Sequence, residues 1–219
     1  MFFNQSCNKK QSKENKKDVL VNETTYHINK SKSKWISVGY SIERKYEPVI
    51  KLGGIKNNQC VVFNENQFTS FLNNQGIMMS FIYSTTSGWQ PMKVDGYEIH
   101  FVFIGDSRII KIVQDDNNEI FLAGDIINEI VNLSDLIKYR YDIIKYQDFS
   151  NYYNILISSA SSKNGDIIKN IYDVIVSLRN VNSVNACCVM KLLTIYPKIV
   201  IEDVESLTCN IFVKNIDKK

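Results

Sequence analysis

Basic and aromatic side chains lie near one another in this chain, and together they can hold a single nucleic-acid strand. Cations follow the phosphates of such a strand, and its bases stack on aromatic rings. Trp35 lies on the more polar side of an alternating segment, where a base-stacking ring is expected. The candidate contact residues are Lys34, Trp35, Arg44, Lys45, Tyr46, Lys51 and Lys56, followed later by Arg108 and Lys111. Most precede residue 60, so we expect that part of the chain to provide most of any affinity.

The charge distribution supports a second interpretation. Residues 1–34 hold eight Lys against three acidic residues, a balance of +5. Residues 35–152 hold ten Lys or Arg against fourteen acidic residues, a balance of −4. Affinity for nucleic acid depends largely on phosphate neutralisation, so an acidic body favours a structural or assembly protein. In that interpretation Trp35 and Tyr46 are packing residues, and the strand lysines only solvate an exposed face.

Enzyme and metal chemistry find little support. The chain has no phosphate-binding glycine pattern, no GxSxG and no HExxH. Its five cysteines show no CxxC spacing, and His100 lies in an apolar segment that favours a structural role. We therefore expect no catalysis, cofactor, metal or small-molecule substrate, and reduced thiols in a nuclear or cytoplasmic protein rather than a secreted one. No run of about 18 apolar residues predicts a membrane helix.

Composition divides the chain into four parts. Residues 1–33 are polar and rich in Lys, Asn and Ser, which predicts a disordered basic tail, either merely solvated or able to contact phosphates or an import receptor. Residues 34–90 and 91–150 each read as a sheet followed by a helix, and 151–219 reads as mainly helical. Heavy use of Asn, Ile and Lys is typical of A+T-rich genomes, such as those of many large insect viruses.

The first sheet-helix unit begins at residue 34. The segments KWISVGYSI, VIKLGG and QCVVF read as strands, the first by its strict alternation. Asn64 then suits a helix N-cap, and Phe68, Phe71 and Leu72 give the following helix one apolar side. The sequence leaves open whether this helix resumes through 77–83.

The second unit repeats the same order. The segments YEIHFVFIG, SRIIKIV and EIFLAG read as strands, and Asp125 is a possible cap for the next helix. A shift of sixty residues aligns Ile50 with Ile110 and Lys51 with Lys111, and Val61–Val62 with Phe121–Leu122. The shared order of strands, loop and helix indicates an internal duplication.

The last part reads as packing or partner-binding helices. Asp166 is a possible cap for an apolar stripe through 167–178, and Pro197 ends a second helix candidate. The segment VIEDVESLTCNIFVKNI fits either a third helix or a pair of strands.

The segment CVVFNENQFTSFLNN resembles the transcriptional coactivator family known as positive cofactor four. The preceding KWISVGYSIERKYEPVIKLGG is similar to that family's two leading strands and turn, and two such units resemble the plant Whirly proteins. The resemblance implies an α+β fold with two antiparallel sheets, each backed by its own helix and paired within one chain as a pseudo-dimer. It also implies a non-enzymatic protein that binds single-stranded DNA in replication, recombination or transcription, with self-association as a further expectation.

Overall fold

A computed structural model describes residues 19–55, 59–115, 118–178 and 182–216. The first repeat is one antiparallel sheet of four strands in chain order, followed by two helices. These elements are β1 (Leu20–His27), β2 (Lys34–Ser41), β3 (Glu47–Gly54), β4 (Cys60–Phe63), α1 (Glu65–Asn73) and α2 (Gln75–Tyr83). The helix that the sequence left open therefore resumes as α2.

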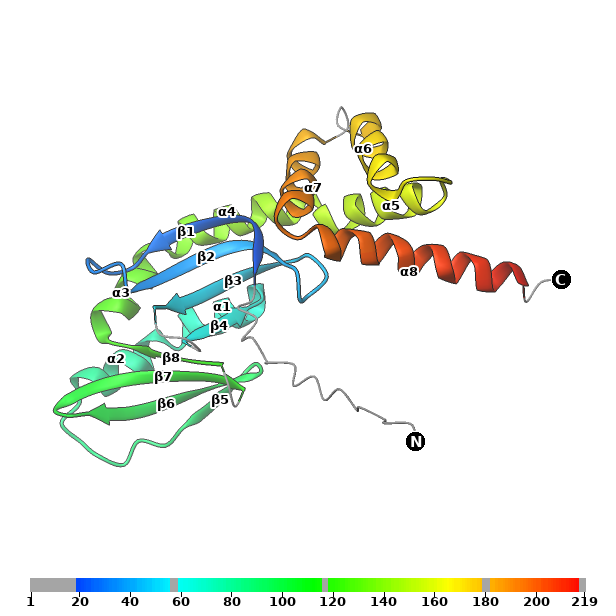
Figure 1. Ribbon diagram of the computed structural model, residues 1–219. Coiled ribbons are helices and arrows are strands. Elements are labelled where there is room, and N and C mark those ends of the chain that lie inside the picture. The colour runs from blue at the N-terminus through cyan, green and yellow to red at the C-terminus, as the bar shows by residue number, and fades with distance from the viewer. Residues whose placement is uncertain (1–18, 56–58, 116–117, 179–181, 217–219) are drawn as a thin grey trace, which may run out of the picture.

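The second repeat has the same order of elements as the first. It consists of β5 (Met92–Val94), β6 (Tyr97–Ile104), β7 (Ser107–Asp115), β8 (Asn118–Leu122), α3 (Gly124–Asn132) and α4 (Ser134–Gln147). The predicted α+β class and internal duplication are confirmed, and the two repeats form a pseudo-dimer within one chain (Figure 1).

The predicted helical C-terminal part is also confirmed. Its helices are α5 (Phe149–Ser161), α6 (Ile167–Leu178), α7 (Ser183–Ile195) and α8 (Pro197–Ile216). The segment that fitted a helix or two strands is the long helix α8. Pro197 opens α8 as well as ending α7, because proline lacks only an N–H that the first helical turn does not use.

The strand register corrects one detail of the predicted repeat alignment. Strand β3 begins at Glu47 and β7 at Ser107, which is the expected shift of sixty. Leu52 pairs with Val61, however, whereas Ile112 pairs with Ile120, so the next strands are related by 59 residues. The predicted match of Val61 with Phe121 was one residue off, and a one-residue slip exchanges the two faces of a strand.

Strand β1 corrects the predicted tail. Residues 20–27 were assigned to disorder, yet they pair with β2 from Leu20 to His27. A register shift between Val21 and Thr24, with Asn22 at φ 55°, interrupts the alternation that would have predicted a strand. Residues 1–18 lie outside the described residues.

Helix starts follow the predicted caps at two of three positions. Asn64 and Gln67 form a reciprocal capping box, with the Asn64 side chain 2.9 Å from the Gln67 N–H. The Asp166 carboxylate accepts from the Lys169 N–H at 2.7 Å. The cap predicted at Asp125 is wrong, because α3 begins at Gly124 and places Asp125 inside its first turn.

The helices are exchanged between the repeats. Helix α4 of the second repeat packs on β2 and β3, and α2 of the first repeat packs on β7. The Tyr40 hydroxyl on β2 donates to the Ile144 carbonyl on α4 at 2.6 Å. Helix α1 does pack on β3 and β4 of its own sheet, as expected, but α4 and α2 lie on the sheet of the other repeat. Only one residue separates α1 from α2, and only one separates α3 from α4. In each repeat the second helix therefore follows the first directly and packs on the opposite sheet.

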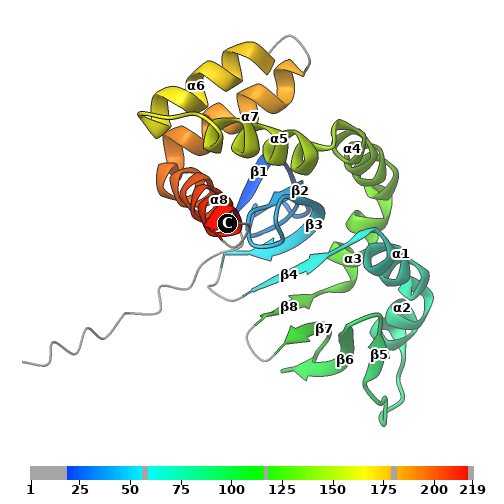
Figure 2. The ribbon, with the colours of Figure 1, turned by 90° about the vertical axis from the view of Figure 1, so that its right-hand side faces the viewer.

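Both sheets turn one apolar face toward these helices (Figure 2). That face carries Ile36, Val38, Ile50 and Leu52 in the first sheet, each at most 1% exposed. In the second sheet it carries Ile99, Ile110, Ile112, Ile120 and Leu122, all fully buried. We call the opposite side of each sheet its outer face.

The two sheets meet where β4 lies beside β7 and β8. The Gln114 side chain on β7 accepts from the Val62 N–H at 2.9 Å and donates to the Val62 carbonyl at 2.7 Å. Gln59 and Glu119 add a parallel bridge between the repeats. The Gln114 amide thus replaces a neighbouring strand at the edge of the first sheet.

Replacing Gln114 by alanine tests this joint. The change leaves the Val62 N–H without its partner, so we expect the free energy of unfolding to fall by about 1–3 kcal/mol. Denaturant unfolding measures it, with Gln90→Ala in an exposed loop as the matched control. Equal stability of the two variants would contradict the role assigned to Gln114.

Candidate nucleic-acid interface

The structure separates the predicted contact residues of the first repeat into two groups. Lys34 and Trp35 begin β2, whereas Arg44, Lys45 and Tyr46 form the turn at its far end. Strand β2 is eight residues long, so its ends, Lys34 and Ser41, are roughly 23 Å apart at the usual rise per residue. The two groups therefore do not form one compact site.

Tyr46 belongs to the core, which removes it from the predicted contacts. It is 6% exposed, and its ring lies 4.4 Å from the Tyr153 ring and 5.3 Å from the Phe149 ring, both on α5. The Tyr153 hydroxyl donates to Asp203 on α8 at 2.7 Å. Tyr46 thus docks the C-terminal helices against the β2–β3 turn, and a nucleobase cannot stack on a ring so deeply enclosed.

The rest of that turn is held but only partly covered. The Arg44 guanidinium donates to the Val62 carbonyl at 3.3 Å, while the exposed Lys45 accepts through its carbonyl from Ser150 at 3.3 Å. Arg44 thus lies near the line where the sheets meet.

Arg108 is the second correction, because it faces the helices. Its guanidinium donates to the Thr86 carbonyl at 3.1 Å and lies 4.7 Å from the centre of the Phe103 ring. These contacts bind the β6–β7 hairpin to the end of α2 and the loop after it. Lys111, two strand positions later than Ile109, lies on the outer face instead.

The two predicted strand lysines occupy corresponding outer-face positions. Lys51 pairs in register with Ser37 and Val62 and is only 9% exposed. Lys111 is half-buried, 2.6 Å from Glu119 and 5.5 Å from the centre of the Phe121 ring. The outer face is consequently closed around Lys51 on the first sheet and more open around Lys111 on the second. Lys56 lies outside the described residues.

Trp35 retains one accessible side. A Cβ on Gly53 would come within 2.7 Å of the Trp35 ring, so this ring lies directly against the Gly53 backbone. The side chain remains partly exposed, and the exposed His27 is its cross-strand neighbour.

The turn between β1 and β2 presents a row of lysines beside Trp35. Asn29 shapes it, since its side chain accepts from the Lys34 N–H at 3.2 Å and donates to the Ser33 hydroxyl at 2.8 Å. Ile28 anchors the turn in the core at 2% exposure. Lys30 and Lys32 are exposed at its tip. The backbone fixes this cationic turn, and the Lys34 ammonium donates to the Gln59 side chain.

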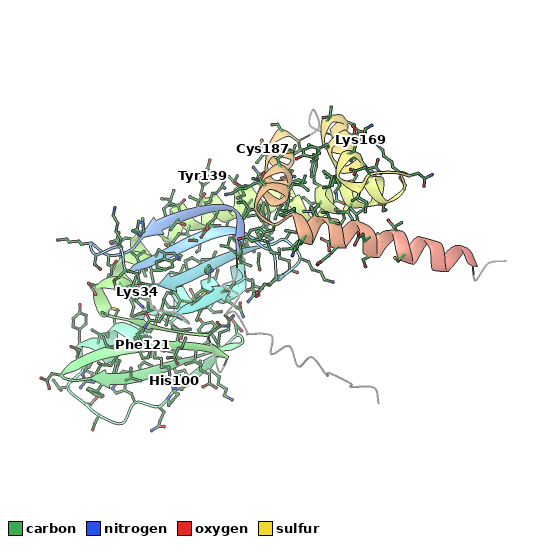
Figure 3. The ribbon with its side chains drawn as sticks, viewed as in Figure 1. Lys34, His100, Phe121, Tyr139, Lys169 and Cys187 are labelled. Carbon is green, nitrogen blue, oxygen red and sulfur yellow. The ribbon has the colours of Figure 1, made fainter. Side chains whose placement is uncertain are left out.

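This lysine turn forms one wall of a cleft between the repeats, with a volume of about 1150 Å³. Figure 3 shows Lys34 at the start of β2 and Phe121 on β8, each contributed by a different repeat. On the side of the second repeat, Ile104, Ser107 and Ile109 of the β6–β7 hairpin also line the cleft. Asp125 and Glu129 line the cleft from α3.

Opposite charges therefore line the cleft. The Lys34 ammonium donates to the Gln59 side chain, and within the described ranges neither Asp125 nor Glu129 forms an ion pair. The partly exposed Phe121 ring lies among them. The cleft thus combines lysines, one aromatic ring and two carboxylates.

Sequence reasoning missed most of the cleft. Its unpredicted residues are His27, Lys30, Phe121, Asp125 and Glu129. The regular spacing of Lys30, Lys32 and Lys34 is evident in the sequence. Residues up to 33 were nevertheless assigned to the disordered tail, because the bulge in β1 interrupts the alternation that would have indicated a strand. Phe121 and α3 reach the cleft only through the pairing of the repeats.

Comparison with family models, with curated proteins and with solved structures found no match to this chain. The fold thus defines its class: an α+β chain in which two sheet-helix repeats close on each other. In the described part, no cluster of His, Cys, Asp or Glu could hold a metal ion. No single described helix is long and apolar enough to cross a membrane; only α7 with α8 up to Cys209 passes by length and composition together, with a 105° bend between them.

Alkaline pH tests the core position of Tyr46. Burial raises the pKa of Tyr46 to about 12, whereas an unfolded tyrosine has a pKa of about 10. Below pH 10 both states keep the proton; above it only the unfolded state loses it, so stability falls as pH rises from 10 to 12. Denaturant midpoints at intervals across this range should fall less steeply in Tyr46→Phe than in Tyr139→Phe, where the ring is 65% exposed. Equal pH dependence of stability in the two variants would contradict the burial of the Tyr46 hydroxyl in the core.

Proposed function

We propose that this protein binds single-stranded nucleic acid, as a non-enzymatic component of replication, recombination or transcription. The observation that carries the proposal is the cleft between the repeats, where a lysine turn faces an aromatic ring. Single-strand binding requires both of these chemistries, and both come from parts of the chain that the pairing of the repeats holds together.

The charge pattern of the cleft favours a nucleotide over an acidic peptide. Phosphates of the strand lie along Lys30, Lys32 and Lys34, and a base stacks on Phe121. An acidic peptide would gain from the lysines but would place further carboxylates near Asp125 and Glu129. A nucleotide instead carries its charge at one end and neutral donor groups at the other.

The outer face extends the binding path beyond the cleft. Trp35 adjoins the lysine turn, and Lys111 with His100 continues across the second sheet, where they are cross-strand neighbours. The Lys111 ammonium is paired with Glu119 and the His100 ring is hydrogen-bonded to Glu98, so this part of the path contributes less than the turn. The bound nucleic-acid strand thus begins at the lysine turn and runs over the outer face of the second sheet.

A second candidate function is assembly, and one observation favours it. Helix α6 exposes Ile168, Tyr172 and Val176 at 45%, 42% and 58%, spaced one turn apart along one side. Such a stripe suits protein contacts. An assembly protein would form a stable oligomer that is indifferent to nucleic acid.

Salt dependence tests the proposed function. Fluorescence anisotropy with a labelled oligothymidine should show binding whose log affinity falls with log salt by about 0.7 for each phosphate neutralised. The double change Lys30→Gln with Lys32→Asn should reduce the magnitude of that slope by about 1.4, since it removes two cations. Asparagine suits position 32, where φ is 54°.

The matched control is Lys163→Gln with Lys169→Gln, which removes the same charge from two exposed sites, one in the loop before α6 and one on α6. Its slope should equal that of the unchanged protein. Absence of binding at low salt, or equal slopes in both double variants, would refute the proposal. Light scattering on the same samples would then show whether the assembly function takes its place.

A further inference from the structure

The acidic side of the cleft is not needed by a protein that binds single strands without sequence preference. Affinity for phosphates is lowered by carboxylates nearby, yet Asp125 and Glu129 both line the cleft. They stand at positions i and i+4 of α3, where like charges destabilise a helix by roughly 0.2–0.5 kcal/mol.

Helix stability accounts for only one of the two. Asp125 lies in the first turn, where a negative charge is favourable next to the helix N-terminus. Glu129 lies a full turn further on, beyond most of that effect. Within the described residues neither carboxylate forms an ion pair. Glu129 is half-buried. Neither the helix N-terminus nor an ion pair accounts for its position in the cleft.

A nucleotide held by the lysine turn would bring its base edge to this wall. The phosphate lies at Lys30 and Lys34, the base stacks on Phe121, and the edge of the base then faces α3. In a single strand that Watson–Crick edge is free for recognition. A carboxylate only accepts hydrogen bonds, so it selects an edge that donates them.

We propose that the cleft selects guanine in single-stranded DNA, with Glu129 as the residue that reads the base. Guanine presents two neighbouring donors, N1–H and N2–H, which fit the two oxygens of one carboxylate. Adenine and cytosine offer one amino group each, and thymine sets its single N3–H between two carbonyl oxygens. This inference rests on the proposed function, because it requires the strand to occupy the cleft.

Competition between matched oligonucleotides tests it. One is oligothymidine, the second contains a single central guanine, and the third contains inosine at that position. Inosine lacks only the N2 amino group, so it removes one donor and keeps the ring system. We expect the guanine oligonucleotide to bind about tenfold more tightly than oligothymidine, with inosine in between.

Glu129→Gln should abolish the advantage of guanine and should raise the affinity for oligothymidine, because it removes a negative charge from the cleft. Asp173→Asn, on an exposed side of α6, is the matched control and should keep the guanine preference. Equal binding of all three oligonucleotides by the unchanged protein would overturn the guanine inference while supporting the proposed function. A preference for guanine that persists in Glu129→Gln would show that Glu129 does not recognise the base. Failure to bind any of the three would instead refute the proposed function.

Discussion

The exchange of helices between the repeats is the interaction on which the rest of the structure depends. Each sheet has one continuous apolar face, and burying a large aliphatic side chain is worth about 1.5–3 kcal/mol. Helix α4 packs on the first sheet and α2 packs on the second, so each repeat relies on the other to cover that face. The pairing is thus built into the folding of both halves rather than added to two finished domains.

The cleft is a consequence of that pairing. Its lysine turn comes from the first repeat, while Phe121 and α3 come from the second. Gln114 supplies hydrogen bonds to Val62 at the edge where the sheets meet. The two walls are different kinds of segment, a β1–β2 turn on one side and helix α3 with β8 on the other, and one wall is basic while α3 is acidic.

Local patterns predicted the elements far better than they predicted the site. The alternation of KWISVGYSI, the cap at Asn64 and the shift of sixty residues correctly indicated strands, helices and a duplication. Strand β1 escaped because a bulge at Asn22 interrupts its period. Tyr46 looked like a surface residue because its burial depends on a helix distant in sequence, and the partly exposed Arg108 is turned toward the loop after α2. Exchange of helices and opposition of Lys30 and Glu129 are tertiary properties that no local pattern contains.

Cleaving the chain between the repeats tests the central claim most directly. A protease site placed between Ser87 and Gly88, in the exposed loop after α2, divides the two repeats without cutting a strand or helix. Because the helices are exchanged, the fragments 1–87 and 88–219 should remain together in size-exclusion chromatography and unfold in one cooperative transition. Fragments that separate in native buffer, or that unfold independently of each other, would show that each repeat completes its own core.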